Sequence, residues 1–237
     1  MNPLVAAFLS ATPSVGAAIA GYSGLLHVPT AEVRENLSLS FNWLSAPRTL
    51  LGTTGDLPVN RTYLVTVPFF PNFEGTLGLL QIVGWSDPQV PVLPYLVHRT
   101  LTLKIRLPLP WYGVAVAFGV VDPVSANFLS HGPALKTHYG MTAAFGVATY
   151  KAGPLAVTVG GGLGDRSIDK QARSEPFLDG LLAGLIWALP GGFQLLAEWD
   201  GFDANVGTRW NGPWGIGITA GRAGGGWLAG SSLGIEL

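Results

Sequence analysis

The stretch LTLKIRL at residues 101–107 places an apolar side chain at every second position, with threonine, lysine and arginine between them. A period of two is the pattern of a β-strand whose two faces meet different surroundings. The same alternation recurs in NLSLSFNW at 36–43, in FQLLAEWD at 193–200 and in WGIGIT at 214–219. In each segment one face is bulky and apolar, while the other is mostly polar or small. The chain is therefore expected to consist of two-faced strands.

The composition agrees with this pattern. Of all residues, 11% are charged, whereas a soluble domain usually carries about 25%. The longest internal apolar run, 180–189, stops at Pro190, well short of the roughly 20 apolar residues that a membrane-spanning helix needs. The formal net charge of −1 gives no electrostatic basis for binding nucleic acid. The chain has no cysteine, which excludes disulfides and thiolate metal sites.

Twelve strands are expected, and their connections differ in length in a regular way. The strands are placed at 36–44, 61–69, 75–85, 98–108, 113–122, 138–150, 155–164, 177–189, 193–201, 204–210, 214–222 and 227–237. Short turns follow the even-numbered strands, and the four long connections follow odd-numbered ones, at 45–60, 86–97, 123–137 and 165–176, although the connections after the last two odd-numbered strands are short. Bacterial outer-membrane barrels combine an even strand number with short periplasmic turns and longer external loops. The sequence therefore predicts an all-β fold, a closed antiparallel up-and-down transmembrane β-barrel in the outer membrane of a Gram-negative-type bacterium.

The direction of each face follows from the membrane setting, because a membrane barrel points bulky apolar side chains at lipid and polar or small ones at the lumen. By this rule Phe145 and Val147 are expected on the outer wall, and Ala144 and Gly146 on the inner one. The facing of strand 75–85 is unassigned because its alternation is poor. Aromatic residues at strand ends are expected to form two interfacial girdles. They are Trp43, Tyr63, Phe69, Trp111, Tyr112, Tyr150, Trp187, Trp199, Trp210, Trp214 and Trp227.

Charged residues within the strands are expected to face the lumen, because a lysine or arginine facing lipid at the midplane costs about 2–4 kcal/mol. The candidates are Lys104, Arg106, Glu198, Asp200, Arg209 and Glu236. Two interpretations stay open at this point. The charges form an ion-pair network that braces a narrow barrel, or they line a polar path or a sugar-binding surface.

The residues before the first strand are expected to form two parts that precede a barrel at 36–237. Residues 1–20 are expected to be a signal peptide cleaved after Ala20, because a short apolar core precedes a small-x-small sequence at 18–20, although basic residues near Met1 are missing. The alternative is an apolar tail. The segment 21–35 is expected to fold, through its residues 21–33, into or across the periplasmic mouth. A twelve-stranded barrel leaves more interior than an eight-stranded one, which wall side chains alone can fill.

The segment GYSGLLHVPTA at 21–31 resembles the opening signature of the YjbH-like family of outer-membrane exopolysaccharide proteins. The residues that carry the resemblance are Gly21, Tyr22, Gly24, Leu25, Pro29, Thr30 and Ala31. Two shorter stretches are also similar to that family, GLIW at 184–187 with the following PG at 190–191, and AEWDG at 197–201 with NVG at 205–207. The resemblance implies a role in exopolysaccharide secretion or envelope assembly, with no enzymatic activity.

The sequence offers little that is typical of catalysis. Its one Gly-x-Ser-x-Gly pentapeptide, at 230–234, lies inside the last expected strand and has no histidine nearby in the sequence. His27, His98, His131 and His138 lack zinc-binding spacing, and the glycine run at 160–164 lacks the lysine of a phosphate loop. We therefore expect no enzyme, no cofactor and no metal site. The expected partners are outer-membrane lipid, with polysaccharide and periplasmic export proteins as candidates, and a closed barrel is expected to be a monomer. Alternatives are a small-solute, porin-like channel, an outer-membrane lipid-modifying enzyme using His138, and a soluble lipocalin-like carrier.

Overall fold

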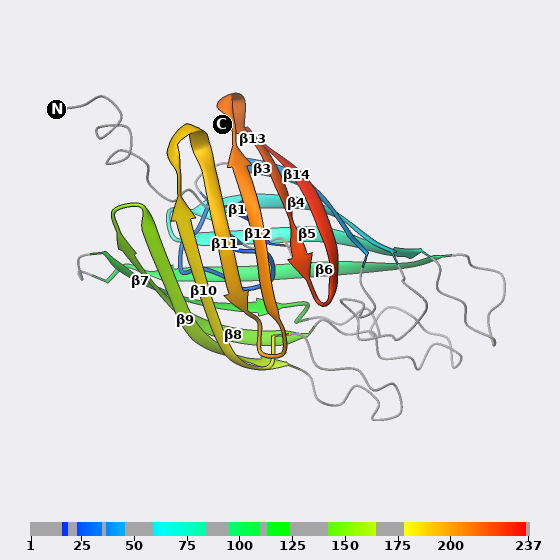
Figure 1. Ribbon diagram of the computed structural model, residues 1–237. Coiled ribbons are helices and arrows are strands. Elements are labelled where there is room, and N and C mark those ends of the chain that lie inside the picture. Colours follow the sequence, from blue (N-terminus) through cyan, green and yellow to red (C-terminus); the bar gives the residue numbers. More distant parts are fainter. Residues whose placement is uncertain are drawn as a thin grey trace.

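The computed structural model describes residues 16–18, 23–34, 37–45, 59–83, 95–109, 113–123, 142–164 and 178–235. Its main feature is a closed barrel, in which each strand pairs antiparallel with the next and β14 pairs with β3 (Figure 1). The twelve strands are β3 (Leu37–Ser45), β4 (Val59–Phe70), β5 (Phe73–Val83), β6 (Tyr95–Leu107), β7 (Val114–Val121), β8 (Ala143–Ala152), β9 (Leu155–Gly164), β10 (Gly180–Ala188), β11 (Phe193–Trp199), β12 (Ala204–Asn211), β13 (Ile216–Ala223) and β14 (Gly226–Ile235). The predicted closed antiparallel barrel is confirmed. Within the described ranges, no helix combines the length and apolar character needed to cross a membrane.

The strand boundaries lie close to the expected ones. β9 begins and ends as predicted, whereas β8 begins at Ala143 in place of 138, with 138–141 outside the described residues. The structure also assigns the facing of β5. Leu80 is buried in the lumen, and Leu77 and Leu79 lie on the outer wall, where they are 62% and 46% exposed. The alternation was hard to interpret because neighbouring leucines occupy opposite faces.

The outer wall is apolar and much of the inner wall is polar. On β3, Leu39 and Phe41 are exposed, while the intervening Ser38 and Ser40 are buried. A water-soluble barrel would place the apolar side chains inside and the polar ones outside. Exposed apolar surface of this extent marks contact with lipid or with another protein.

The facing predicted for β8 is wrong. Phe145 and Val147 point into the lumen and are 4% and 2% exposed, whereas Ala144 is exposed on the outer wall. The reason is a glycine on the neighbouring strand. Gly119 of β7 lies opposite Phe145, and a Cβ there would clash with the phenylalanine ring. The inner wall is locally apolar at this place, so bulk alone did not indicate the lipid-facing side.

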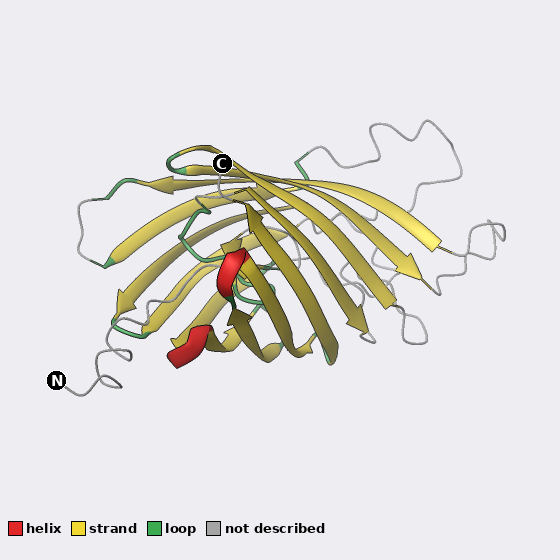
Figure 2. Cartoon of the chain, turned by 90° about the horizontal axis from the view of Figure 1, so that it is seen from above, coloured by secondary structure: helices red, strands yellow, loops and turns green. Residues whose placement is uncertain are grey.

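The two ends of the barrel differ. The turn rim carries the short connections at 71–72, 153–154, 189–192 and 212–215, two of which form the 3-10 turns Pro190–Gly192 and Pro213–Gly215 (Figure 2). The loop rim is the opposite end, at which β3, β5, β7, β9, β11 and β13 finish. Its tightest connection joins β13 to β14 through Gly224 and Gly225, whose φ angles of 56° and 76° suit the mirror-image turn of a two-residue hairpin.

The described residues that precede β3, 16–18 and 23–34, lie within the barrel (Figure 1). β1 (Gly16–Ala17) pairs antiparallel with β2 (Ser23–Gly24), and Ala18 is fully buried. The chain then continues through residues 25–34 before β3 begins. We call residues 23–34 the lumen segment. β1 falls inside the expected signal peptide, whose cleavage after Ala20 stays a prediction, and residues 1–15 and 19–22 are outside the described part of the chain.

Candidate functional site

The lumen segment is a tight loop enclosed by the barrel wall. All of its residues from Ser23 to Ala31 are buried. The amide of Leu25 donates to the carbonyl of Val28 at 2.9 Å, and the amide of Thr30 donates to the carbonyl of Ser23 at 3.1 Å. A Cβ on Gly24 would lie too close to the backbone of residues 28 and 29. The glycine of the motif is therefore required by the close approach of the two arms of the loop.

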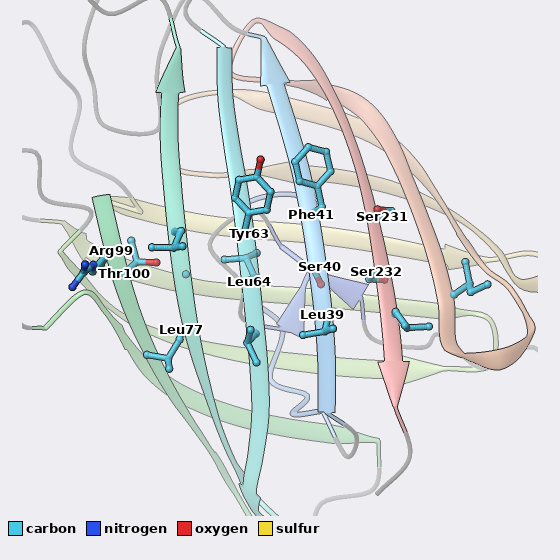
Figure 3. Close-up of a pocket in the computed structure, with 15 residues that line it drawn as sticks. Leu39, Ser40, Phe41, Tyr63, Leu64, Leu77, Arg99, Thr100, Ser231 and Ser232 are labelled. Carbon is cyan, nitrogen blue, oxygen red and sulfur yellow. The ribbon is translucent and has the colours of Figure 1, made fainter. Parts of the chain in front are cut away.

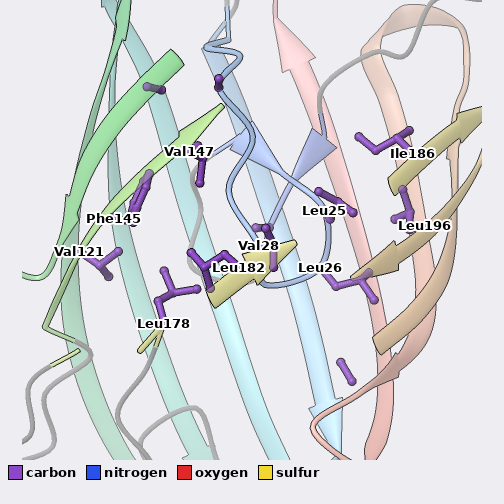
Figure 4. Packing of buried hydrophobic residues seen from close by; sticks show 14 of the residues in the cluster. Leu25, Leu26, Val28, Val121, Phe145, Val147, Leu178, Leu182, Ile186 and Leu196 are labelled. Carbon is purple, nitrogen blue, oxygen red and sulfur yellow. The ribbon is translucent and has the colours of Figure 1, made fainter. Parts of the chain in front are cut away.

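Apolar side chains of the segment fit against glycines of the wall. Leu25 packs over Gly184 of β10, where a Cβ would stand 2.9 Å from its methyl groups, and Leu26 packs over Gly207 of β12 and Gly221 of β13. Figure 4 shows Leu25, Leu26 and Val28 among buried leucine and isoleucine side chains of the wall. The missing side chains of three wall glycines thus form the space that two leucines fill.

One buried carboxylate receives three consecutive amides of the segment. Leu26 and Val28 each donate their N–H to Glu198 Oε2 at 3.0 Å, and His27 donates its N–H to Glu198 Oε1 at 2.8 Å. Successive N–H groups that converge in this way form an anion-binding nest. The anion here is a side chain of β11. Because a buried carboxylate is costly without donors, the loop and Glu198 stabilise each other.

The side chain of His27 adds a positive group to the same place. Its Nδ1 lies 3.3 Å from Glu198 Oε1 and 3.4 Å from Asp200 Oδ2. Burial alone would lower the pKa of His27, but the hydrogen bond and charge of Glu198, with the charges of Asp200 and Asp203, outweigh it and raise the pKa. The protonated imidazolium is therefore favoured beside the two carboxylates. Asn205 joins these carboxylates, since its Nδ2 donates to Glu198 at 3.1 Å and to Asp200 at 2.8 Å.

The geometry of this group also resembles a metal-ligand set, because ligand atoms of His27, Glu198 and Asp200 all lie within 4.8 Å of one another. The hydrogen bonds weigh against this use. Both oxygens of Glu198 already accept backbone N–H groups of the lumen segment. A cation bound there would compete with the donors that fix the loop, so the group is better described as the anchor of the segment.

A second anchor lies on the other side of the lumen. Lys104 Nζ stands 2.9 Å from Glu74 Oε1, and both side chains are almost fully buried. Glu74 accepts the amides of Ser23 and Arg34 at 2.7 and 2.8 Å and also the hydroxyl of Ser23. Lys104 donates to the carbonyls of Ser23 and Thr30 at 3.0 and 3.2 Å. This ion pair therefore holds both arms of the loop.

The two anchors stand on opposite walls. Glu74 belongs to β5 and Glu198 to β11, which are six strands apart in either direction around the barrel. Between them, Arg209 of β12 donates to the carbonyl of Leu25 at 2.8 Å. On β8, Thr149 accepts the amide of Ala31 at 2.8 Å. The lumen segment is thus attached on several sides and crosses the interior of the barrel.

Most of the charged candidates from the sequence meet at this segment. Lys104, Glu198, Arg209 and Asp200 surround it as described above, and Arg106 lies 3.4 Å from Glu32 near the end of the segment. The sixth candidate, Glu236, is outside the described residues. Glu74 was missed, because the strand expected at 75–85 began one residue after it and was also left without a facing, whereas β5 begins at Phe73. Its register opposite Lys104 is the signal that could have identified it.

The described motif residues lie in the lumen segment, and the described girdle residues lie toward the two rims of the barrel. Gly24, Leu25, Pro29, Thr30 and Ala31 belong to the lumen segment, while Gly21 and Tyr22 are not among the described residues. Trp43, Tyr63, Trp199 and Trp227 stand toward the loop rim, and Phe69, Tyr150, Trp187, Trp210 and Trp214 toward the turn rim. Trp111 and Tyr112 lie outside the described ranges. Two aromatic belts at opposite ends are the arrangement that membrane barrels use.

Part of the inner wall carries polar atoms without a partner. Ser38, Ser40 and Asn42 follow one another on the lumen face of β3, and Thr62 lies beside them on β4. The three hydroxyls and the Asn42 amide nitrogen have no hydrogen-bond partner in the part of the chain that the structure describes. Such groups suit water or a hydroxyl-rich solute.

The chain matches no protein-family model, no curated protein and no solved structure. The YjbH-like resemblance of residues 21–31 therefore stays a prediction.

Proposed function

We propose that the chain spans an outer membrane as a β-barrel closed by its own lumen segment, and that it serves in secretion of an extracellular polysaccharide or in envelope assembly without catalysing a reaction. The proposal rests on one combination of features: the outer wall is apolar, and the polar interior is crossed by a firmly attached segment. Lipid is the surrounding that such an outer wall fits. The attached segment favours a regulated or assembly role over free passage of solutes.

The polysaccharide part of the proposal rests on the segment itself. The stretch that resembles the exopolysaccharide family, 21–31, overlaps the stretch that crosses the lumen. A segment that served only as a targeting signal or a spacer would have no reason to carry Gly24, Leu25 and Leu26, which fit the interior of the barrel. We infer that closure of the barrel is part of its activity, and that a passing polymer has to displace the segment from Glu74 and Glu198.

Membrane location is tested by fractionation. After a carbonate wash, the protein should stay in the outer-membrane fraction, and the unboiled sample should migrate faster on a denaturing gel than the boiled one. A closed barrel that resists detergent gives this shift because it stays folded. Recovery in the soluble fraction with one band would contradict the proposal at its first step.

The secretion role is tested in the native host. A strain without the protein should lose or reduce its surface polysaccharide, and the wild-type gene should restore it. An unchanged polysaccharide layer, with envelope integrity also unchanged, would overturn the assigned role while leaving the membrane location intact.

A small-solute channel is the second candidate, and the unpartnered polar groups of Ser38, Ser40, Asn42 and Thr62 favour it. A row of such groups along one wall can hydrate a narrow passage beside the segment. Single-channel recordings separate the two candidates. A barrel whose lumen is blocked by the docked segment should show almost no conductance, whereas a conductance that is open most of the time would favour the channel.

A further inference from the structure

The outer wall carries a groove of about 890 Å³ over the strands β13, β14, β3, β4, β5 and β6 (Figure 3). Its volume falls within the roughly 300–1,000 Å³ of pockets that hold small molecules. Two register rows of outward side chains line it. The upper row, nearer the loop rim, is Ser231, Phe41, Tyr63, Leu79 and Arg99, each paired with the next across the strands. The lower row, nearer the turn rim, is Ile216, Leu233, Leu39, Val65 and Leu77.

The chemistry of the groove changes from one row to the other. The upper row offers the hydroxyls of Ser231 and Tyr63 and the guanidinium of Arg99, whereas the lower row is entirely aliphatic. An amphiphile fits such a surface in one direction, with its polar head toward the loop rim and its chain toward the middle of the wall.

Arg99 determines which class of amphiphile the groove fits. It is exposed on the outer wall and has no ion pair with any residue in the described ranges. At outward positions of the described strands, the charged residues are Arg61, Arg99 and Arg222, and no acid occurs there. An arginine facing lipid costs about 2–4 kcal/mol at the midplane and less near the interface. An anion supplied from outside the chain would remove this cost.

We propose that the groove binds an anionic, phosphate-headed lipid of the leaflet at the loop rim, with its phosphate at Arg99 and an acyl chain along the lower row. The proposal rests on the membrane location proposed above. Arginine matches phosphate because its planar fork of N–H donors can bind two phosphate oxygens at once. A second copy of the chain fits less well, because the described outer wall has no carboxylate to meet Arg99.

The test is lipid binding by the purified full chain in neutral detergent, measured by native mass spectrometry with phosphatidylglycerol as the probe. Arg99→Gln should weaken binding by about tenfold, which corresponds to about 1.4 kcal/mol and is within reach of one charge-assisted hydrogen bond. Arg222→Gln is the matched control, since it removes an outward arginine that does not line the groove. It should change binding by less than about twofold, as expected for a screened surface charge.

A second pair of variants tests whether the lipid occupies the groove, without touching the charge of Arg99. Ser231→Phe adds a ring inside the groove and should reduce binding as strongly as Arg99→Gln. Ala229→Phe adds the same ring on the same strand and face, outside the groove, and should leave binding unchanged. Both positions are exposed, so neither ring has to enter the barrel interior.

Three results would overturn the proposal. One is equal binding by Arg99→Gln and Arg222→Gln. Another is full competition by inorganic phosphate, which would indicate an anion site that needs no lipid chain. The third is a wild-type dimer that Ser231→Phe disrupts, which would make the groove a contact between copies. Because binding is measured in detergent, these results are separate from the fractionation that tests membrane location.

Discussion

Replacing Glu198 by glutamine should release the lumen segment while leaving the barrel closed. The carboxylate accepts three consecutive amides, from Leu26, His27 and Val28. Glutamine keeps one acceptor oxygen and turns an NH2 group toward these donors. Hydrogen bonds to a charged acceptor contribute about 1.5–3 kcal/mol each. The loss of two at the lower limit costs about 3 kcal/mol, or roughly a 150-fold change in the ratio of docked to undocked segment.

Amide hydrogen exchange measures this change directly. The three amides should exchange up to about 150-fold faster in Glu198→Gln, while amides in the ladder between β11 and β12 keep their wild-type protection. Planar-bilayer recordings should show openings that the wild type lacks.

The matched control is Glu32→Gln, another carboxylate at the segment. Glu32 is partly exposed and lies 3.4 Å from Arg106 and 3.2 Å from Lys151, so its removal should cost less than about 1 kcal/mol. If the three amides keep their protection in a Glu198→Gln barrel that still shows the heat-dependent gel shift, the anchoring role assigned to Glu198 is wrong.

Three further perturbations test other parts of the site. Gly184→Val should push Leu25 from its position at a cost of about 1–3 kcal/mol, seen as proteolysis of the segment, whereas the outward Gly161→Ala should not. Lys104→Met leaves Glu74 unpaired and should lower the free energy of unfolding in urea by about 3–5 kcal/mol, and a companion Glu74→Gln should restore part of it. The raised pKa of His27 means that its protonation stabilises the closed state fully below the ordinary pKa of about 6.5. This contribution is lost as pH rises through the raised pKa. Proteolysis of the segment should therefore become faster as pH rises in the wild type but not in His27→Gln.

Alternation was sufficient to predict the barrel and the inward position of several charges. A period of two places Lys104 on the opposite face from the leucines beside it, and the same holds for Glu198 next to Trp199. Arg209 follows from the adjacent Trp210. The structure has all three side chains in the interior.

What the alternation could not supply is the partner of each charge. The amide that meets Glu198 at Leu26 lies 172 residues away in the sequence, and a backbone N–H carries no side-chain signature. The facing of β8 failed for a related reason, because Phe145 points into the lumen at a place where the absent side chain of Gly119 leaves room for its ring. Both facts depend on which strands become neighbours, and local patterns do not contain that information.

The placement of the two anchors sets an order on assembly. The lumen segment precedes the barrel strands in the sequence, yet Glu198 is separated from His27 by 171 residues and Glu74 from Ser23 by 51. Closing the longer of these loops requires most of the chain to be in place, since such contacts form only after the loop entropy is overcome. The part that is made early is therefore the part that docks late. A chain stopped before β11 would keep the residues that contact the segment from β5, β6 and β8, namely Glu74, Lys104 and Thr149, but it would lack Glu198 and Arg209. The nest of amides would then be open to whatever anion the cell presents.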